Sequence, residues 1–381
     1  MLLIKNATIL TMESNPFKGC LLIENGKIKE MAEEIDIACE TIDAEGKIVT
    51  PGLIDAHCHV GMWEDGMDFE GADGNEMTEP VTPHLRAIDA INPMDRAFED
   101  AYQAGVTTIS TGPGSSNVIG GQFAVIKTFG NRIDDMIVKA PSAIKCAFGE
   151  NPKKVYGEQH KAPLTRMATA ALLRQALMEA KEYLKNKEAE DEDKHPDFDM
   201  QHEALIPLFK KEIPLKAHAH RADDIFTAIR IAKEFDLKIT LDHCTEGHLI
   251  VDYLKQEGLP AIVGPSLSER SKVELRSLTF ETPGILNKAG IKIAIMTDHG
   301  VIPIQYLSLC AALAAKAGMD KEEALKAITL YPAEILEIED RVGSLKVGKD
   351  ADIVIWDRHP LDMESRVLTT IINGKVIYKN K

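Results

Sequence analysis

Two pairs of histidines stand at the ends of short apolar runs in this sequence. His57 and His59 close the run at residues 52–56, and His218 and His220 close the run at residues 215–219. Because side chains alternate along a strand, positions i and i+2 point to the same side. If these runs are strands, each pair can therefore hold one metal ion between two imidazole nitrogens.

Two later apolar runs also end in residues of metal-ligand type. Asp242 and His243 follow residues 239–241, and Asp298 follows residues 291–296. One such residue alone is as often a polar residue at the start of a loop, but four run ends in chain order favour a metal site. Imidazole nitrogen with carboxylate oxygen suits a divalent metal, zinc foremost and iron or manganese as alternatives.

The middle of the chain must supply a scaffold that brings these run ends together. Near-continuous apolar runs alternate there with helical patterns, as in a parallel sheet covered by helices. The pattern predicts an α/β fold, a (β/α)₈ TIM-type barrel over residues 50–340 with its active site at the carboxyl ends of the strands. A doubly wound open sheet is the alternative, but its phosphate-binding GxGxxG signature is absent. The runs lie at residues 52–56, 106–110, 142–148, 215–219, 239–241, 261–264 and 291–296.

Both ends of the chain carry strand patterns around an Asn-Gly turn, at residues 25–26 and at residues 373–374. Asn-Gly between apolar runs is typical of a type I′ hairpin. Short sheets cannot bury a face alone, so the two ends are expected to pack together. We therefore predict a small β-sandwich domain built from residues 1–49 and 341–381. A barrel insertion at about residues 151–203 contains an acidic run, residues 188–193, that we expect to be solvated.

Composition excludes several classes of partner. The chain has 381 residues with 60 acidic and 44 basic side chains, a formal charge of −16, which repels nucleic acid and anionic membranes. No apolar run reaches the 18 or so residues that a membrane span needs, and no signal peptide is visible. The six cysteines form no CxxC pair, which suits a reducing compartment. A cytoplasmic protein is expected, and a homo-oligomer is compatible with these features.

Longer motifs give a resemblance to a known family. Residues 49–59 read Val-Thr-Pro-Gly-Leu-Ile-Asp-Ala-His-Cys-His, and residues 343–354 read Gly-Ser-Leu-Lys-Val-Gly-Lys-Asp-Ala-Asp-Ile-Val. With the barrel pattern and the split β domain, these motifs resemble the amidohydrolase superfamily of metal-dependent hydrolases, in the branch that contains imidazolonepropionase. The resemblance covers nearly the whole chain and is specific to the superfamily, not to a substrate.

The resemblance implies a set of metal ligands on the first, fifth, sixth and eighth barrel strands. His220 lies on the same strand face as the fifth-strand ligand and is expected to face substrate or to act as an alternate ligand. The implied ligands are His57, His59, His218, His243 and Asp298.

Two-metal members of the superfamily carry a bridging carboxylate on the fourth strand, either a glutamate or a carboxylated lysine. Glu150 and Lys145 are the two candidates in this sequence. We favour Glu150, because it lies at the end of the strand where ligands cluster. Two ions per chain are expected, with one ion as the alternative.

These residues predict hydrolysis of a carbon–nitrogen bond, in a linear or cyclic amide of a small molecule. A metal ion lowers the pKa of bound water to near neutrality. Asp298, with His243 beside it, is placed to take the water's proton and pass it to the leaving amine. Arg221, His220 or His299 is expected to hold the oxyanion or a substrate carboxylate.

The alternatives differ in substrate or in the loss of catalysis. Deaminases of the superfamily, and imidazolonepropionase, place a glutamate three residues after the fifth-strand histidine. Here that position is Arg221, or Asp223 when it is counted from His220. This departure disfavours both reactions. A dipeptidase of prolidase type or an N-deacetylase is the enzymatic alternative, and a metal-binding scaffold on a decayed barrel is the non-enzymatic one.

The loop after the first barrel strand is strongly acidic, with seven acids and no lysine or arginine in residues 64–79. Since it follows His59 directly, we expect it to overhang the metal site and to favour amine-bearing substrates. The acids are Glu64, Asp65, Asp68, Glu70, Asp73, Glu76 and Glu79.

Overall fold

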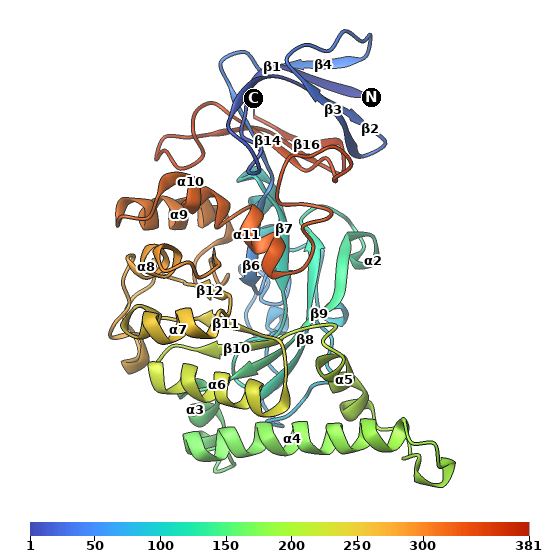
Figure 1. Ribbon diagram of the computed structural model, residues 1–381, viewed down its shortest axis with the longest axis vertical. Helices are drawn as coiled ribbons and strands as arrows, with labels where there is room; N and C mark the ends of the chain where they lie inside the picture. Colours follow the sequence, from blue (N-terminus) through green and yellow to red (C-terminus); the bar gives the residue numbers. More distant parts are fainter. Residues whose placement is uncertain (381) are drawn as a thin grey trace.

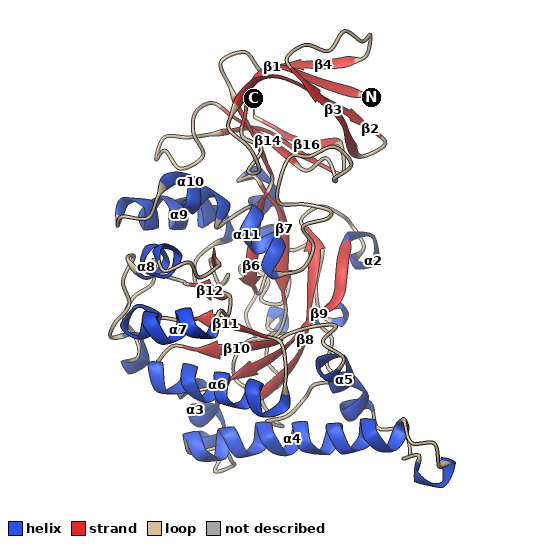
Figure 2. Cartoon of the chain, viewed as in Figure 1, coloured by secondary structure: helices blue, strands red, loops and turns tan. Residues whose placement is uncertain are grey.

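Eight strands form a nearly closed barrel in the middle of the computed structural model, which describes residues 1–380 (Figures 1 and 2). The barrel confirms the predicted fold class. In chain order, which is also their order around the barrel, the strands are β6 (Leu53–Cys58), β7 (Val106–Thr111), β8 (Ile119–Lys127), β9 (Ile137–Ala147), β10 (Leu215–Ala219), β11 (Ile239–His243), β12 (Ala261–Val263) and β13 (Ile293–Ile295).

Helices cover the outside of the barrel, and Figure 2 shows them stacked along one side of its strands. The helical patterns that the sequence predicts between the apolar runs are confirmed as helices. The helices are α1 (Arg96–Gln103), α2 (Ile133–Met136), α3 (Glu150–Glu158), α4 (Arg166–Lys187), α5 (Met200–Phe209), α6 (Ala222–Phe235), α7 (Val251–Glu257), α8 (Thr282–Lys288), α9 (Leu307–Lys316), α10 (Lys321–Lys326) and α11 (Leu330–Ile335).

The third barrel strand departs from the parallel arrangement that the sequence predicts. β8 pairs antiparallel with both β7 and β9, whereas the other ladders of this sheet are parallel. Only residues 112–118 separate β7 from β8. A parallel connection needs about a dozen residues or more, so a link this short can only reverse the chain. The prediction of an all-parallel barrel is wrong at this strand.

The strands from the two chain ends form one further sheet, in the order β16-β15-β14-β5-β1-β2-β3, with β4 paired to β1. Their buried side chains share one apolar core. The two Asn-Gly turns have positive φ at both residues, as a type I′ turn requires. We call this the end sheet; the predicted boundaries of the domains stay a prediction. Its strands are β1 (Leu2–Ile9), β2 (Phe17–Glu24), β3 (Lys27–Ala32), β4 (Glu40–Asp43), β5 (Ile48–Pro51), β14 (Ile353–Trp356), β15 (Val367–Ile372) and β16 (Lys375–Lys379).

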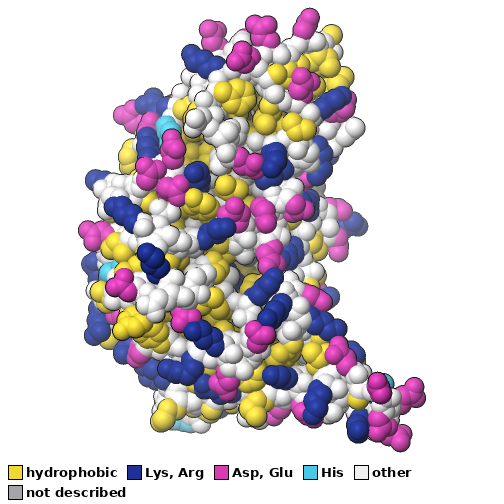
Figure 3. All heavy atoms as spheres, viewed as in Figure 1, with side chains coloured by type: hydrophobic (Ala, Val, Ile, Leu, Met, Phe, Trp, Pro, Cys, Tyr) yellow, Lys and Arg dark blue, Asp and Glu magenta, His cyan; other side chains and the backbone are white. Residues whose placement is uncertain are grey.

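The segment between β9 and β10 contains α3, α4 and α5 and corresponds to the predicted insertion. α4 runs across the end of the molecule opposite the end sheet, and the chain beyond it protrudes (Figure 1). The acidic side chains of residues 188–193 are exposed there, and Figure 3 shows acidic groups gathered at this tip. Among the described helices, none has both the length and the apolar character that crossing a membrane demands.

A buried ion cluster joins the barrel to the end sheet. Lys127, at the end of β8, is 2% exposed. Its Nζ lies 2.5 Å from an oxygen of Asp352 and 3.2 Å from an oxygen of Asp350. Asp350 is also paired with Arg341, at 2.9 Å. Buried charges are stable only while they are paired with an opposite charge. The pairs of Lys127 with Asp350 and Asp352 therefore fix how the barrel and the end sheet meet.

We expect Lys127→Met to lower the free energy of unfolding by about 3–5 kcal/mol, because it leaves Asp352 buried without its cation. Urea denaturation measures this change. Lys321→Met is the matched control, since the 2.8 Å pair of Lys321 with Asp362 is half-exposed, and such pairs contribute about 1 kcal/mol or less. Equal losses in the two variants would contradict a structural role for the buried cluster.

Candidate metal centre

Two groups of ligand-type side chains lie at the carboxyl ends of the barrel strands. The first contains His57 at the end of β6, His59 just beyond it and Asp298 just beyond β13, with their ligand atoms within 4.8 Å of one another. Asp298 Oδ1 lies 3.2 Å from His59 Nε2 and 3.5 Å from His57 Nε2. The fold therefore brings together the predicted ligands from the first and last barrel strands.

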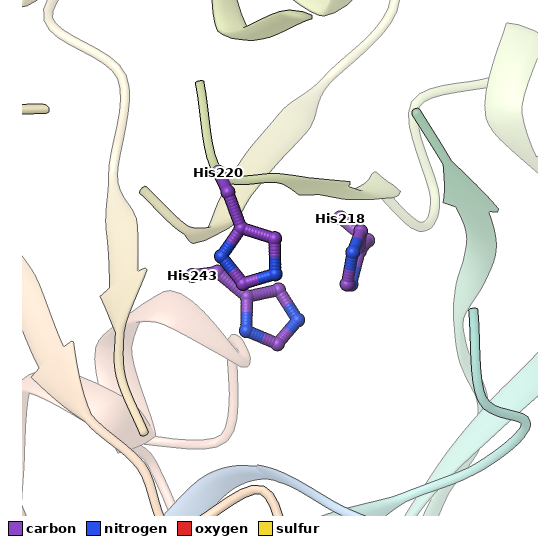
Figure 4. Close-up of side chains that lie close together, drawn as sticks. All are labelled: His218, His220 and His243. Carbon is purple, nitrogen blue, oxygen red and sulfur yellow. The ribbon is translucent and has the colours of Figure 1, made fainter. Parts of the chain in front are cut away.

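The second group contains His218 and His220 from the end of β10 and His243 from the end of β11, again within 4.8 Å. Figure 4 shows the three rings facing one another. The ring centre of His218 lies 4.1 Å from that of His243. Since the ring centres of His57 and His243 are only 5.4 Å apart, the two groups adjoin and form one site.

Hydrogen bonds hold three of these rings with Nε2 directed into the site. Nδ1 lies 2.6 Å from Asp242 Oδ2 in His57, 2.7 Å from the Gly112 carbonyl oxygen in His59 and 2.9 Å from the Gly264 carbonyl oxygen in His243. Because these partners are acceptors, Nδ1 carries the proton and donates it. Nε2 then keeps its lone pair, as in most metal-binding histidines.

Burial keeps His57, His218, His220 and His243 neutral, which is the form that binds metal. Loss of hydration lowers the pKa of His57, His218 and His243 well below the ordinary value. For His220, burial, followed by the charges of Lys272 and Lys145, lowers the pKa to about 3.

Several of these nitrogens have no partner in the protein. Within residues 1–380, neither nitrogen of His218 nor Nε2 of His243 makes a hydrogen bond, although all three are buried. An unsatisfied buried polar atom costs about 1–3 kcal/mol. A divalent cation would take up the free lone pair of each of these two rings, so the residues present fit a metal ion. His220 differs, because its Nδ1 is 2.8 Å from Thr245 Oγ1.

Lys145 lies at the junction of the two groups. It is fully buried on β9, and its Nζ is 3.1 Å from His57 Nε2. It lines the same cavity as His218 and His243 of the other group, and its charge contributes to lowering the pKa of both. Burial lowers the pKa of Lys145 itself to about 8, against the opposing charges of Asp242 and Asp298.

Glu150, favoured from the sequence as the bridging ligand, is not brought into the site. It is the first residue of α3, it belongs to neither ligand group, and its backbone nitrogen donates to Glu274 Oε2 at 3.0 Å. Gly149, with a φ of 84°, turns the chain before Glu150. The structure therefore does not bring Glu150 to the two ligand groups, whereas it brings Lys145 to His57.

Two predicted substrate-binding residues also lie elsewhere. Arg221 precedes α6, and its guanidinium makes two hydrogen bonds of 2.9 Å to Asp223. His299 supports its own loop, because its Nδ1 accepts from the Ile304 backbone nitrogen at 3.1 Å. Neither lines the cavity at the barrel mouth, whereas His220 does. The structure therefore does not bring Arg221 and His299 to the cavity, and their substrate-binding roles stay predictions.

A cavity of about 700 Å³ opens above the two ligand groups. The first barrel loop contributes Trp63, whose ring centre lies 4.9 Å from that of His59, and Asn75. None of the seven acids of this loop lines the cavity, and all but the half-buried Glu64 are exposed. The charged side chains that do line it are Lys145, Glu269, Lys272 and Asp298.

Sequence reasoning missed the buried groups that support the ligands. Asp242 Oδ2 accepts from His57 and also lies 3.1 Å from Lys216 Nζ, which donates to the Ala56 carbonyl oxygen at 3.0 Å. Asp55 accepts from the backbone nitrogens of His57 and Thr297, both at 3.0 Å. Asp242 stands beside a ligand in the sequence, which is a signal that could have pointed to it. Asp55 and Lys216 each stand two residues before a ligand, His57 and His218, so strand alternation is a signal that could have pointed to them.

The geometry can be set beside known proteins. The sequence model of the amidohydrolase family matches residues 48–377. The chain belongs to this family.

Individual relatives agree with this assignment. The crystal structure of an amidohydrolase from Thermotoga maritima MSB8 is 45% identical, with a TM-score of 0.97 over 100% of both chains. Amidohydrolase tasK of Hapsidospora irregularis is 28% identical over 98% of this chain but 42% of its own length, so this chain spans less than half of that relative. Imidazolonepropionase of Paracoccus denitrificans (strain Pd 1222) is 26% identical over 99% of each.

We expect Asp242→Asn to weaken metal binding about 10- to 100-fold, as loss of a carboxylate behind a ligand histidine does. The asparagine amide can donate to His57 Nδ1, which moves the ring proton to Nε2 and removes the lone pair there. Chelator competition measures the metal affinity. The control Asp223→Asn alters an exposed carboxylate of α6 and should leave the affinity unchanged. Unchanged affinity in Asp242→Asn would exclude this role.

Proposed function

We propose that the protein is a metal-dependent amidohydrolase that hydrolyses a carbon–nitrogen bond, in a linear or cyclic amide, of a small molecule. The observation that carries this proposal is the set of neutral, buried imidazole nitrogens without protein partners at the barrel mouth, next to the carboxylate of Asp298. The cytoplasmic location and a homo-oligomer stay predictions.

Two divalent ions fit the donor atoms, zinc foremost, with iron or manganese as alternatives. His57, His59 and Asp298 would hold one ion, and His218 and His243 the other. We assign the bridging position to Lys145 after carboxylation, in which its neutral amine joins carbon dioxide, releases a proton and becomes a carboxylate. The lowered pKa of Lys145, about 8, supports this, because it makes the neutral amine accessible near physiological pH.

Metal ions bound there would supply a nucleophilic hydroxide near neutral pH and polarise the substrate carbonyl. Asp298 lines the cavity with a side chain that is 11% exposed, so its carboxylate can accept the proton of the attacking water and deliver it to the leaving amine. His243 also lines the cavity and orients the reacting group of the substrate. His220, which also faces the cavity, is the proposed donor to the oxyanion.

Deamination and the imidazolonepropionase reaction fit the residues of this site less well. The position of the deaminase glutamate holds Arg221, which is turned toward Asp223. Deamination and the imidazolonepropionase reaction therefore lack that proton carrier. A dipeptidase of prolidase type or an N-deacetylase would use the same metal-assisted hydrolysis at the barrel mouth and stays the enzymatic alternative. A metal-binding scaffold on a decayed barrel stays the non-enzymatic alternative.

Asp298→Asn tests the catalytic part of the proposal. We expect turnover to fall by about 10²- to 10⁴-fold, the usual contribution of a general base. Amine release from N-acyl amino acids, dipeptides and cyclic amides is measured with metal-reconstituted protein, and thermal melting confirms that the variant folds. Asp65→Asn, in the exposed acidic loop, is the control. Activity that survives in Asp298→Asn would exclude its role in proton transfer, and a wild type without any turnover would favour the scaffold.

The two candidates for the bridge give opposite expectations. Wild type should retain about two metal ions per chain, as two-metal hydrolases do. Lys145→Gln should lose at least one of them, while Glu150→Gln should keep both. Elemental analysis after gel filtration measures the content, and intact-protein mass spectrometry under mild conditions detects the carboxylated lysine. The opposite pattern of metal loss would restore Glu150 as the bridge.

A further inference from the structure

Three polar side chains from separate segments of the chain form one wall of the cavity. Ser115 follows β7, Asn151 is the second residue of α3, and Lys272 precedes the short 3₁₀ helix η5 (Val273–Leu275). Lys272 Nζ donates to Asn151 Oδ1 at 2.5 Å, and Asn151 Nδ2 donates to Ser115 Oγ at 2.7 Å. All three line the cavity together with His218, His243 and Asp298. We call Ser115, Asn151 and Lys272 the polar wall.

The direction of these hydrogen bonds leaves donors available to a ligand. Ser115 accepts from Asn151, so its own hydroxyl hydrogen is free, and it has no acceptor among residues 1–380. The Lys272 ammonium has three N–H groups and uses one of them on Asn151. Its other neighbour, Glu274 Oε1, is 3.9 Å away, beyond hydrogen-bond distance. The wall therefore presents several donors and one positive charge.

Such a wall matches an acceptor-only, negatively charged group. A carboxylate has two acceptor oxygens and no donor, and hydrogen bonds to a charged partner are the strong ones. Lys272 is the cation available for this, because Lys145, the other lysine of the cavity, is buried between the histidines. Glu269, also on the cavity lining, has no ion-pair partner in the described chain. Lys272 pairs with Glu274 at 3.9 Å, which offsets part of its charge but occupies none of its N–H groups.

We propose that the polar wall binds the carboxylate of the substrate, so that the enzyme acts on an amide that also carries a carboxylate, as in N-acyl amino acids and dipeptides. The inference rests on the proposed hydrolase function. Carboxylate at the wall and amide at the metal groups can be bridged by one small molecule, because a single cavity of about 700 Å³ contains both.

The kinetic test compares matched substrates on metal-loaded protein. N-acetyl amino acids are compared with the corresponding N-acetyl amino alcohols, in which a neutral hydroxymethyl group replaces the carboxylate. Lys272→Met should lower kcat/KM for the acids about 10- to 100-fold, mainly through KM, as expected for a hydrogen bond to a charged group. The neutral analogues should be poor substrates of wild type and unaffected by the substitution. Lys272→Arg should restore part of the loss.

The control is Lys154→Met, which removes an exposed lysine of the same helix as Asn151. It should leave the kinetics of both substrate classes unchanged. If Lys272→Met and Lys154→Met behave alike on the acids, the polar wall does not bind carboxylate, and the proposed hydrolase function is untouched.

A binding measurement separates this inference from the proposed function. The fluorescence of Trp63, which lines the cavity, is followed while an N-acetyl amino acid is titrated into the metal-loaded protein. Weaker binding by Lys272→Met without turnover by wild type would support the carboxylate site and overturn the hydrolase. Equal binding by wild type and Lys272→Met, or no binding by wild type, would overturn the carboxylate site itself.

Discussion

The central constraint in this structure is the burial of several imidazole rings at one end of the barrel. Burial makes protonation unfavourable, so the rings stay neutral, and their Nδ1 partners decide which nitrogen keeps a lone pair. Those partners come from different parts of the barrel: Asp242 from β11, Gly112 from the loop after β7 and Gly264 from the loop after β12. The fold therefore positions protons as well as side chains, and the unsatisfied nitrogens that result are what a metal ion would stabilise.

The reversed strand β8 connects the candidate site to the rest of the molecule. Because β8 runs antiparallel, its last residue, Lys127, lies at the end of the barrel away from the metal centre, where it meets Asp352 of the end sheet. The short link before β8 stays at the mouth. There Gly112 accepts from His59, and Ser115 lines the cavity. One chain reversal thus explains both how the end sheet is anchored and how part of the active-site wall is formed.

The histidine pairs and the barrel were predictable because period-two alternation and strand ends are local properties of a sequence. The choice of Glu150 over Lys145 used the strand-end rule alone, whereas Lys145 reaches the site from inside the strand with a long side chain. Alternation also argues against Arg221 as a substrate-binding residue. His218 and His220 share the strand face that points into the site, so the next residue is expected to point away from it. The partners of Asp242 and Lys272 were out of reach for another reason. Asp242 meets His57 and Lys272 meets Asn151, 185 and 121 residues away, only through the fold.

The acidic loop and the lysine of the polar wall suggest opposite substrates, and distance decides between them. Charges beyond about 8 Å are largely screened at physiological ionic strength. The loop acids are mostly exposed and do not line the cavity, whereas Lys272 does. Long-range charge acts mainly on how a ligand approaches, while hydrogen bonds inside a cavity determine which ligand stays bound. The net charge of −16 therefore describes the surface, and the polar wall is the better guide to the bound group.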